Sequence, residues 1–514
     1  MDPKLAARRR IVVALIILVV FVGIGIAFKK LVFPALEEKR VEETGTKTHY
    51  KTNVRIGMDS FSGYAVLRSP HFRDQLGRSE IGVQGIDDKA DYTGRMKALQ
   101  KGDLDMAVFT IDTDIINGTE IKEFPGTILF LIDESFGADG IVAFKSGVAS
   151  ASDLNRADAK IIAKPNSPSE TLARHLIANM LPNLASQNWL VKATDMDDVL
   201  ERMKKADQSE PNAYVLWEPE LSKALALEGV VPIYDTSHVS GVIVDVLLVN
   251  RKYLQDQSAI VKTVTSSYFR ALHFYGTADG GMAKLVMDDA KLNGDTLTDV
   301  QAKKIADGIK WKNTMENYAQ FGLLSAAELH GLPTMREMIV GISQFLVKTG
   351  KLKTNPKEGK ETDLYFDEVL KSMNQSNFHP GQTQDEVVRG VANLPELTDA
   401  QWKTLLKVGD MDAKSISFAR GRAEIEIQGK RDVADVANRL KAWPTYYLSI
   451  IGHTRGDGDP AANLALALAR AKNVSDELVA LGVSPTRIKT SAELLKTQSG
   501  TAQSVTFTLS QRPY

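Results

Sequence analysis

Short apolar runs alternate with amphipathic segments from residue 53 to about residue 250, and this alternation restricts the fold more than any other feature. The runs are rich in β-branched residues and are only a few residues long, which predicts strands, whereas the segments between them show helical spacing of apolar residues. Such alternation favours an α/β fold with parallel sheets covered by helices on both faces. The predicted strands are Val54–Gly57, Leu104–Thr110, Thr127–Ile132, Gly140–Phe144, Lys160–Ala163, Ala213–Trp217 and Val242–Val249, and the predicted helices are Asp91–Lys101, Ser169–Met180 and Met196–Ala206.

The N-terminus carries a basic segment followed by a long apolar run. Ile11–Phe28 contains no charge and is bounded by basic residues on both sides. As a helix it would be about 27 Å long, close to the thickness of the hydrocarbon layer. No small-residue cleavage site follows, and basic flanks stay cytoplasmic. We predict a cytoplasmic tail over residues 1–10, a single-pass transmembrane signal anchor in the inner membrane over 11–28, a spacer over 29–52 and a periplasmic body.

Composition and motifs exclude several classes of protein. With 43% hydrophobic and 25% charged residues, the chain is neither disordered nor polytopic. The 63 basic and 64 acidic residues nearly cancel, so no overall field draws it to nucleic acid. It has no cysteine, no glycine-rich phosphate loop, no nucleophile elbow and no paired metal-ligand spacing. We therefore expect a protein that is not an enzyme and that holds no cofactor and no metal.

The remainder of the chain divides into three parts. Val261–Met373 is mainly helical in pattern, and the Asn-, Gln-, Pro- and Gly-rich residues that follow indicate a linker over 374–410. Within that linker, Thr398 and Gln401 predict a capping box for a short helix that ends at Gly409. Residues 411–514 form a separate small unit of strand, helix, strand, helix and strand.

A series of motifs runs through residues 53–373. They are Met58–Tyr64, Met96–Val108, Gly140–Lys145, Ser152–Leu154, Asn166–Ser169, Leu216–Pro219, Asp245–Val249 and Gly308–Trp311. Their order resembles that of periplasmic solute-binding proteins of the nitrate/taurine/sulfonate ABC-transporter type. The resemblance implies a type II binding-protein fold with lobe 1 at about 53–139 and 241–373, lobe 2 at about 140–240, and a ligand cleft between them. It also implies a small-molecule solute and an ABC permease as partners.

Four loops at strand ends or helix starts supply candidate ligand contacts, because ligands of open α/β sheets bind where these ends converge. Free N–H groups at a helix start suit a small anion, so we expect an anionic solute. Several of these residues also have structural alternatives: the serines can cap helices, the acidic residues can cap a turn or a helix start, and the aromatic residues can belong to the core. The predicted ligand-binding residues are Ser60, Ser62, Gly63, Tyr64, Thr110, Asp112, Ser167, Ser169, Trp217 and Glu218.

The C-terminal unit has motifs of its own at Tyr447–Thr454, Asn463–Val474 and Leu481–Ile488. Together they resemble the OmpA-like peptidoglycan-associated domain over about residues 416–509, a small α+β fold. Asn463 and Arg470 are seven residues apart, so they share one helix face and could present an amide and a guanidinium to a carboxylate. The resemblance implies that Thr454, Asn463 and Arg470 bind peptidoglycan.

One position departs from that family's pattern. After Gly-His-Thr the family has an aspartate, which takes the ammonium of diaminopimelate, whereas this chain has Arg455. A basic residue repels that ammonium, although Asp457 or Asp459 could substitute. The family's Arg-Arg pair before the last strand is also replaced, by Gln503 and Ser504.

Two functional hypotheses follow. In the first, the protein is a membrane-anchored periplasmic solute-binding protein whose lobes close on a small anion while the C-terminal domain docks to the cell wall. In the second, the lobes have lost solute binding and serve as an interaction or sensing module in an envelope complex. The short spacer and the wall-binding domain favour the second, because they constrain both ends of the chain. An enzyme related to pyrimidine synthesis is disfavoured, because the histidines do not cluster.

The N-terminal segment generates a test of topology. Alkaline phosphatase fused to the C-terminus should be active in cells, because the basic flank keeps the N-terminus cytoplasmic and sends the body outward. A β-galactosidase fusion at the same point should be inactive. The reverse pattern of activities would contradict the predicted compartment.

Overall fold

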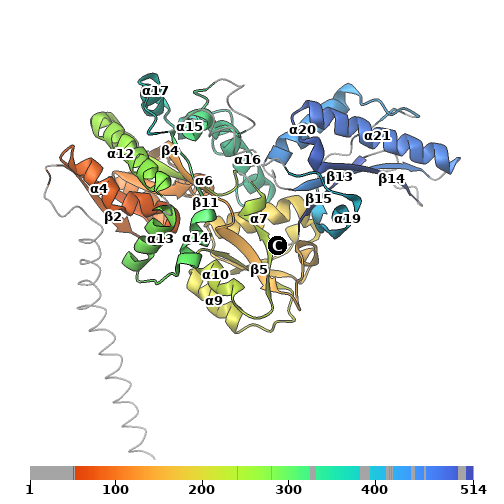
Figure 1. Cartoon of the computed structure of the whole chain (residues 1–514), viewed down its shortest axis with the longest axis horizontal. Helices are drawn as coiled ribbons and strands as arrows, with labels where there is room; N and C mark the ends of the chain where they lie inside the picture. Colours follow the sequence, from red (N-terminus) through yellow and green to blue (C-terminus); the bar gives the residue numbers. More distant parts are fainter. Residues whose placement is uncertain are drawn as a thin grey trace, which may run out of the picture.

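The computed structural model describes residues 50, 52–239, 241–278, 281–324, 332–381, 394–411, 416, 418–419, 421–441, 446–455, 459–495 and 505–512. The predicted cytoplasmic tail, the membrane anchor and nearly all of the spacer lie outside these ranges. Among the helices within them, none is both long and apolar enough to cross a membrane. The described chain forms two α/β lobes and a C-terminal domain (Figure 1).

Lobe 1 is built on a six-stranded sheet with the order β11-β4-β10-β3-β1-β2. β1 pairs in parallel with β2 and β3, β10 is antiparallel to both β3 and β4, and β11 is antiparallel to β4. The strands are β1 (Thr52–Met58), β2 (Ile81–Asp87), β3 (Met106–Thr110), β4 (Gly126–Ser135), β10 (Val244–Asn250) and β11 (Ile309–Trp311). The helical elements are η2 (Ser62–Tyr64), α3 (Ala65–Arg68), α4 (Pro70–Gly77), α5 (Tyr92–Lys101), α6 (Ile111–Ile121), α11 (Arg251–Asp256), α12 (Ser258–Thr277), α13 (Gly281–Leu292), α14 (Asp299–Asp307), α15 (Thr314–Gln320), α16 (Met335–Lys348), η5 (Glu361–Leu364) and α17 (Glu368–Gln375).

Lobe 2 is built on a five-stranded sheet with the order β7-β6-β8-β5-β9. β6 is parallel to β7 and β8, whereas β5 is antiparallel to β8 and β9. The strands are β5 (Asp139–Phe144), β6 (Lys160–Ala163), β7 (Leu190–Lys192), β8 (Asn212–Trp217) and β9 (Val230–Asp235). The helical elements are η3 (Ala151–Leu154), α7 (Pro168–Met180), α8 (Pro182–Ala185), α9 (Met196–Lys204), α10 (Glu220–Leu225) and η4 (Thr236–His238).

The chain crosses between the lobes twice, from β4 into β5 and back from β9 into β10. The sequence predicted parallel sheets, whereas the sheet of each lobe contains both parallel and antiparallel pairs. A strand that returns from the other lobe enters the first sheet from the opposite end, so β10 runs antiparallel to both of its neighbours.

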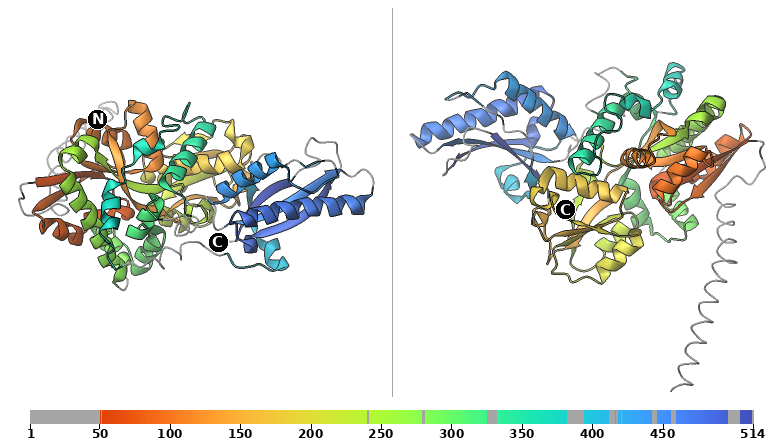
Figure 2. Two further views of the ribbon diagram at one scale, coloured as in Figure 1. Left: turned by 90° about the horizontal axis from the view of Figure 1, so that it is seen from above. Right: turned by 180° about the vertical axis from the view of Figure 1, so that it is seen from behind.

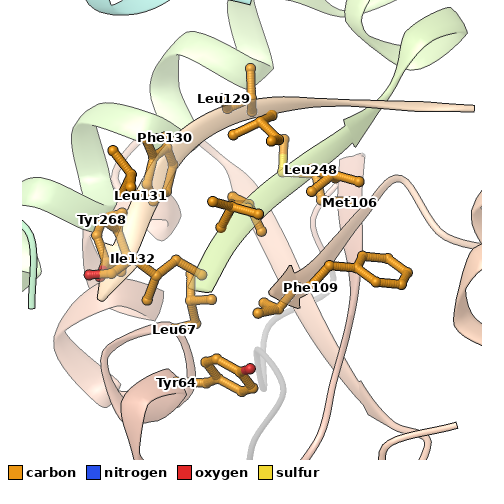
Figure 3. Packing of buried hydrophobic residues seen from close by; sticks show 14 of the residues in the cluster. Tyr64, Leu67, Met106, Phe109, Leu129, Phe130, Leu131, Ile132, Leu248 and Tyr268 are labelled. Carbon is orange, nitrogen blue, oxygen red and sulfur yellow. The ribbon is translucent and has the colours of Figure 1, made fainter. Parts of the chain in front are cut away.

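The core of lobe 1 packs the apolar faces of β3, β4 and β10 against α3 and α12 (Figure 3). All ten residues of β4 are buried. The ring of Phe130 stacks on that of Tyr268 from α12, with centroids 4.8 Å apart. A buried ion pair joins Arg68 to Asp289 at 2.6 Å, and the same guanidinium donates to the carbonyls of Asp59 and Phe61. These contacts fix the loop that follows β1, which carries part of the candidate site.

The C-terminal domain contains a four-stranded sheet with the order β12-β15-β13-β14 and the long helices α20 and α21 (Figure 2). Its predicted capping box at Thr398 is confirmed, but the helix ends at Thr404 rather than Gly409. Leu406–Asp410 instead forms β12, because its backbone pairs with the last strand. The elements are α19 (Asp399–Thr404), β12 (Leu406–Asp410), α20 (Ile427–Lys441), β13 (Tyr447–Arg455), α21 (Pro460–Ala480), η7 (Pro485–Arg487), β14 (Ile488–Leu495) and β15 (Val505–Gln511).

The C-terminal domain packs on lobe 2. Strand β12 contacts α7, and a side chain at Gly409 would collide with Met180, so glycine permits this close approach. Arg439 of α20 donates to the side chain of Asn179 at 3.2 Å. One apolar cluster therefore contains core residues of both lobe 2 and the C-terminal domain.

Helix α16 bridges the two lobes, because it packs against α6 of lobe 1 and α7 of lobe 2. Lys348 at its end donates to the carbonyl of Ala178 at 2.8 Å, and Lys351 forms an ion pair with Glu170 at 2.9 Å. Arg174 donates to the carbonyl of Thr349 at 2.9 Å. The segment that contains α16 therefore contacts both the start and the end of α7.

Candidate functional site

A small cavity lies between the two lobes, at the carboxyl ends of β1, β3 and β8. Its volume is about 20 Å³, which is close to the space needed by one water molecule. Its walls come from both lobes and from the two crossings between them. The lining residues are Asp59, Phe61, Tyr64, Tyr92, Thr110, Asp139, Pro168, Trp217, Ile243 and Asp245.

Three of the ten predicted ligand-binding residues line this cavity: Tyr64, Thr110 and Trp217. The hydroxyl of Tyr64 donates to the carboxylate of Asp245. Thr110 ends β3, is the N-terminal cap residue of α6 and forms a capping box with Thr113. The half-buried ring of Trp217 packs against the core of lobe 1 and a core of lobe 2. Tyr64 and Trp217 are thus wall residues as well as core residues, because the cavity lies at the junction of these cores.

The other residues predicted in the first loop lie beside the cavity. Ser60 is exposed and Ser62 is buried, and neither lines the cavity. Gly63 accepts a hydrogen bond at its carbonyl from the Trp311 indole at 2.8 Å. A side chain at Gly63 would collide with the carboxylate of Asp133, so glycine is needed for the close packing of this loop.

The residues predicted around the start of α7 are used for contacts within the protein. The Thr171 hydroxyl of α7 donates to Asp112 of α6, so this pair joins the two lobes directly. Ser167 is the N-terminal cap residue of α7, but its hydroxyl donates to the carbonyl of Lys164 at 2.7 Å. Ser169 is buried, and its hydroxyl lies 4.0 Å from the sulfur of Met196.

Two acidic residues bear on the structural alternatives for these positions. Glu170 accepts from the backbone N–H of Asn166 at 2.7 Å, and the side chain of Ser167 forms no cap hydrogen bond to α7. Glu218 accepts hydrogen bonds from the backbone N–H and the hydroxyl of Ser222. These contacts match its structural alternative as a carboxylate at a helix start.

Sequence reasoning missed most of the acidic wall. Asp59 follows β1 directly, Asp139 begins β5, and Asp245 lies near the start of β10. The available signal was an acidic interruption of an apolar strand, by Asp245 in Val242–Val249 and by Asp133 and Glu134 in Thr127–Ser135. Charged residues are rarely buried in strands without a partner, so such an interruption indicates a functional or strained position.

Strand register places two acidic residues, Asp133 and Asp245, side by side in the sheet of lobe 1. Asp245 of β10 lies opposite Thr110 of β3 on one side and opposite Asp133 of β4 on the other. Asp133 in turn lies opposite Trp311 of β11. Residues directly opposite one another across strands project from the same face. Asp133 and Asp245 therefore both face the lobe junction.

Basic side chains neutralise only part of this acidic group. Arg95 is fully buried and forms ion pairs with Asp59 at 3.0 Å and Asp88 at 2.5 Å. No ion pair joins Asp133, Asp139 or Asp245 to a basic residue within the described ranges. For Asp133, no donor reaches either carboxylate oxygen in the part of the chain that the structure describes.

Burial raises the pKa values of these carboxyl groups. Removal from water raises the pKa of Asp133 to about 8 and that of Asp139 to about 7. Desolvation, followed by the charge of Asp133, raises the pKa of Asp245 well above its usual range. The two adjacent carboxyls hydrogen-bond to each other only if they share a proton, so they titrate as a pair.

The charge of the cleft is opposite to that required by our expectation of an anionic solute. An anion in the cavity would lie against acidic side chains, and the N–H of Asn166 just before α7 already donates to Glu170. A larger cavity of about 670 Å³ lies elsewhere, where α7, α16 and α20 meet. Its lining combines basic residues such as Arg336 and Arg439 with acidic residues such as Glu337 and Asp435, so it favours neither charge.

The predicted peptidoglycan-binding residues lie on β13 and α21. Thr454 donates to the carbonyl of Asn463 at 3.1 Å, and Asn463 itself is half-buried. Arg470 is only 1% exposed and donates to the carbonyls of Arg422 at 2.9 Å and Ala419 at 3.3 Å. Its remaining terminal nitrogen, Nη1, is buried and has no acceptor among the described residues.

Comparison with known proteins gives one family match. Residues 417–504 match the OmpA family, which confirms the resemblance found in the C-terminal motifs. Among curated proteins, no sequence matches the chain.

Solved structures similar to this chain include three binding proteins. The periplasmic nitrate-binding protein of Synechocystis PCC 6803 is 10% identical with a TM-score of 0.48, and the match covers 67% of this chain and 92% of that chain. The periplasmic aliphatic sulphonate-binding protein of Escherichia coli is 16% identical with a TM-score of 0.45, covering 61% and 92%. The alkanesulfonate-binding protein of Xanthomonas axonopodis pv. citri, bound to MOPS, is 12% identical with a TM-score of 0.45, covering 62% and 99%.

The buried carboxyl pair generates a prediction about stability and pH. Folded Asp133 keeps its proton to a pH of about 8, whereas an aspartate in an unfolded chain loses it near pH 4. The folded state then binds more protons between these values, so the free energy of unfolding falls as the pH rises. In Asp133→Asn this fall should be smaller, and at pH 8 the variant should gain on the order of 1–3 kcal/mol over the wild type.

Urea unfolding at several pH values between 5 and 8 measures this difference. Asp158→Asn is the matched control, because Asp158 is exposed on lobe 2 and should leave the pH dependence unchanged. Equal pH dependence of the wild type and Asp133→Asn would show that Asp133 is ionised in the folded protein.

Proposed function

We propose that this protein is a solute-binding protein whose two lobes close on a small molecule and whose C-terminal domain attaches to the cell wall. The observation that carries the proposal is the cavity between the lobes. Tyr64 and Thr110 line it from lobe 1, and Pro168 and Trp217 line it from lobe 2. A ligand held there contacts both lobes at once, which is the arrangement needed for ligand-dependent closure.

The mechanism is a hinge motion selected by the ligand. The two crossings, β4 to β5 and β9 to β10, are the connections about which the lobes rotate. Ser135 and Thr236, one at each crossing, hydrogen-bond to one another at 2.7 Å and hold the two connections together. A ligand that contacts both lobes stabilises the closed state by its additional contacts there. The proposal requires no covalent chemistry.

The proposed location follows from the sequence. Ile11–Phe28 would anchor the protein in the inner membrane, with the lobes in the periplasm and an ABC permease or an envelope complex as partner. The OmpA family match over residues 417–504 supports attachment to peptidoglycan at the other end of the chain.

A second function is favoured by the contacts that hold the lobes together. The cavity has space for about one water molecule, and α16 packs against both lobes. The hydrogen bond between Thr171 and Asp112 adds a direct link. A permanently closed pair of lobes would serve as an interaction or sensing module in an envelope complex.

A mass-spectrometric search for a retained small molecule distinguishes these functions. The full-length protein, purified without denaturation, should carry a solute, and Trp217→Ala should lose it because one wall of the cavity is removed. Trp402→Ala is the matched control, since Trp402 lies on α19 of the C-terminal domain. An empty wild-type protein, together with lobes that do not change their separation under any tested solute, would favour the interaction module.

The C-terminal domain generates a prediction about the cell wall. Nη1 of Arg470 has no acceptor among the described residues but is buried, so a stem-peptide carboxylate would reach it only if the backbone at Ala419 and Arg422 moved aside, whereas Arg455 should repel the neighbouring ammonium. The full-length protein should therefore sediment weakly with purified peptidoglycan. Arg470→Ala should abolish sedimentation by a loss on the order of 2–5 kcal/mol, and Arg455→Asp should strengthen it.

Arg156→Ala is the control for this experiment, because Arg156 is an exposed arginine of lobe 2. Circular dichroism of each variant checks that the domain remains folded. Unchanged sedimentation of both Arg470→Ala and Arg455→Asp would place any wall contact outside the family's site.

A further inference from the structure

The cavity between the lobes is lined by three carboxyl side chains from three different elements. Asp59 follows β1, Asp139 begins β5, and Asp245 lies on β10. We infer that the cleft binds the primary ammonium group of a cationic solute. This inference rests on the proposed solute-binding function and specifies the chemical class of the solute.

The number of acceptors matches the number of donors. A primary ammonium carries three N–H donors and no acceptor. The three lining carboxyls can each accept one of these hydrogen bonds, and the hydroxyl of Thr110 offers a further acceptor. Charge-assisted hydrogen bonds of this kind are about twice as strong as neutral ones. The lining is thus complementary to a primary ammonium in donor count as well as in charge.

Within the described chain, too few basic side chains lie near these acidic residues to balance them. Arg95 is shared by Asp59 and Asp88, so two acidic groups already surround one guanidinium. Asp133 lies opposite Asp245 in the strand register, faces the same junction and receives no hydrogen bond from any described donor. Burial without a basic partner keeps such a carboxyl protonated, and a bound cation would favour its ionised form by displacing the proton.

Aromatic rings supply the remaining walls. Phe61, Tyr64, Tyr92 and Trp217 all line the cavity. The faces of such rings attract cations through their quadrupoles and repel anions. The site already shows this preference, because the guanidinium carbon of Arg95 lies 4.9 Å from the centre of the Tyr92 ring.

Size separates a primary ammonium from other cations. A volume of about 20 Å³ accepts a group the size of water, which an ammonium group is, whereas a quaternary ammonium is too large and has no N–H donors. Within the described residues, no group of three or more acidic or histidine side chains could hold a metal ion. The rest of a larger solute enters only when the lobes part.

The test measures thermal unfolding of the full-length protein with simple salts at equal ionic strength. Methylammonium chloride should raise Tm above the value in sodium chloride, because binding to the folded state stabilises it by mass action. Tetramethylammonium chloride, calcium chloride, sodium nitrate and sodium methanesulfonate should leave Tm at the sodium chloride value.

Variants locate the effect in the cleft. Asp139→Asn removes one charged acceptor and should weaken methylammonium binding about tenfold or more in calorimetric titration. Trp217→Leu should weaken it while Trp217→Phe retains it, because only the second keeps a ring face. Asp158→Asn, on the exposed surface of lobe 2, should bind like the wild type.

The outcomes separate this inference from the proposed function. A rise in Tm with nitrate or methanesulfonate, and none with methylammonium, would overturn the ammonium class and leave solute binding intact. A rise with calcium or with tetramethylammonium alone would also overturn it. If methylammonium has no effect and purification yields a neutral solute, only the ammonium assignment fails. If no salt acts and no solute is retained, both proposals fail.

Discussion

The register between β4 and β10 is the constraint on which the candidate site depends. These strands carry the chain out of lobe 1 and back into it, so their pairing fixes where the lobes meet. The same pairing sets Asp133 directly opposite Asp245, although like charges in that position destabilise a sheet. A shift of β4 by one residue would turn Asp133 to the other face, away from Asp245, and would also turn the apolar residues of β4 away from their core. The core of lobe 1 and the acidic cleft are therefore fixed by one set of backbone hydrogen bonds.

Much of the architecture could be predicted from the sequence because it depends on local patterns. Strands such as Lys160–Ala163 and helices such as Pro168–Met180 lie within a residue or two of their predicted limits. The direction of β10 could not be predicted from its own residues, because an apolar strand has the same composition in either direction. Likewise, β12 has only five residues, and it is a strand because β15 lies beside it.

The candidate site was predicted less completely because its charge arises from tertiary structure. Tyr64, Thr110 and Trp217 could be found at strand ends, where ligands are expected. Asp139 and Asp245 lie 106 positions apart in the sequence numbering and meet only through the folding of two strands. Helix-start serines suggested an anion, but the cavity beside this helix start is lined by Asp59, Asp139 and Asp245. In the C-terminal domain, Arg470 lies on a helix, α21, as its spacing indicates, but the backbone at Ala419 and Arg422 that covers it could not be inferred from spacing.

The attachment of the C-terminal domain to lobe 2 has a mechanical consequence. The described chain enters through β1 in lobe 1, whereas the C-terminal domain rests on α7 in lobe 2. Apart from the covalent connection between α17 and α19, a pulling force between the two ends of the molecule would pass through the crossings and through the contacts of α16. Tension would act in the direction in which the cleft opens. A solute bound in the cleft would therefore change the stiffness of the molecule in that direction.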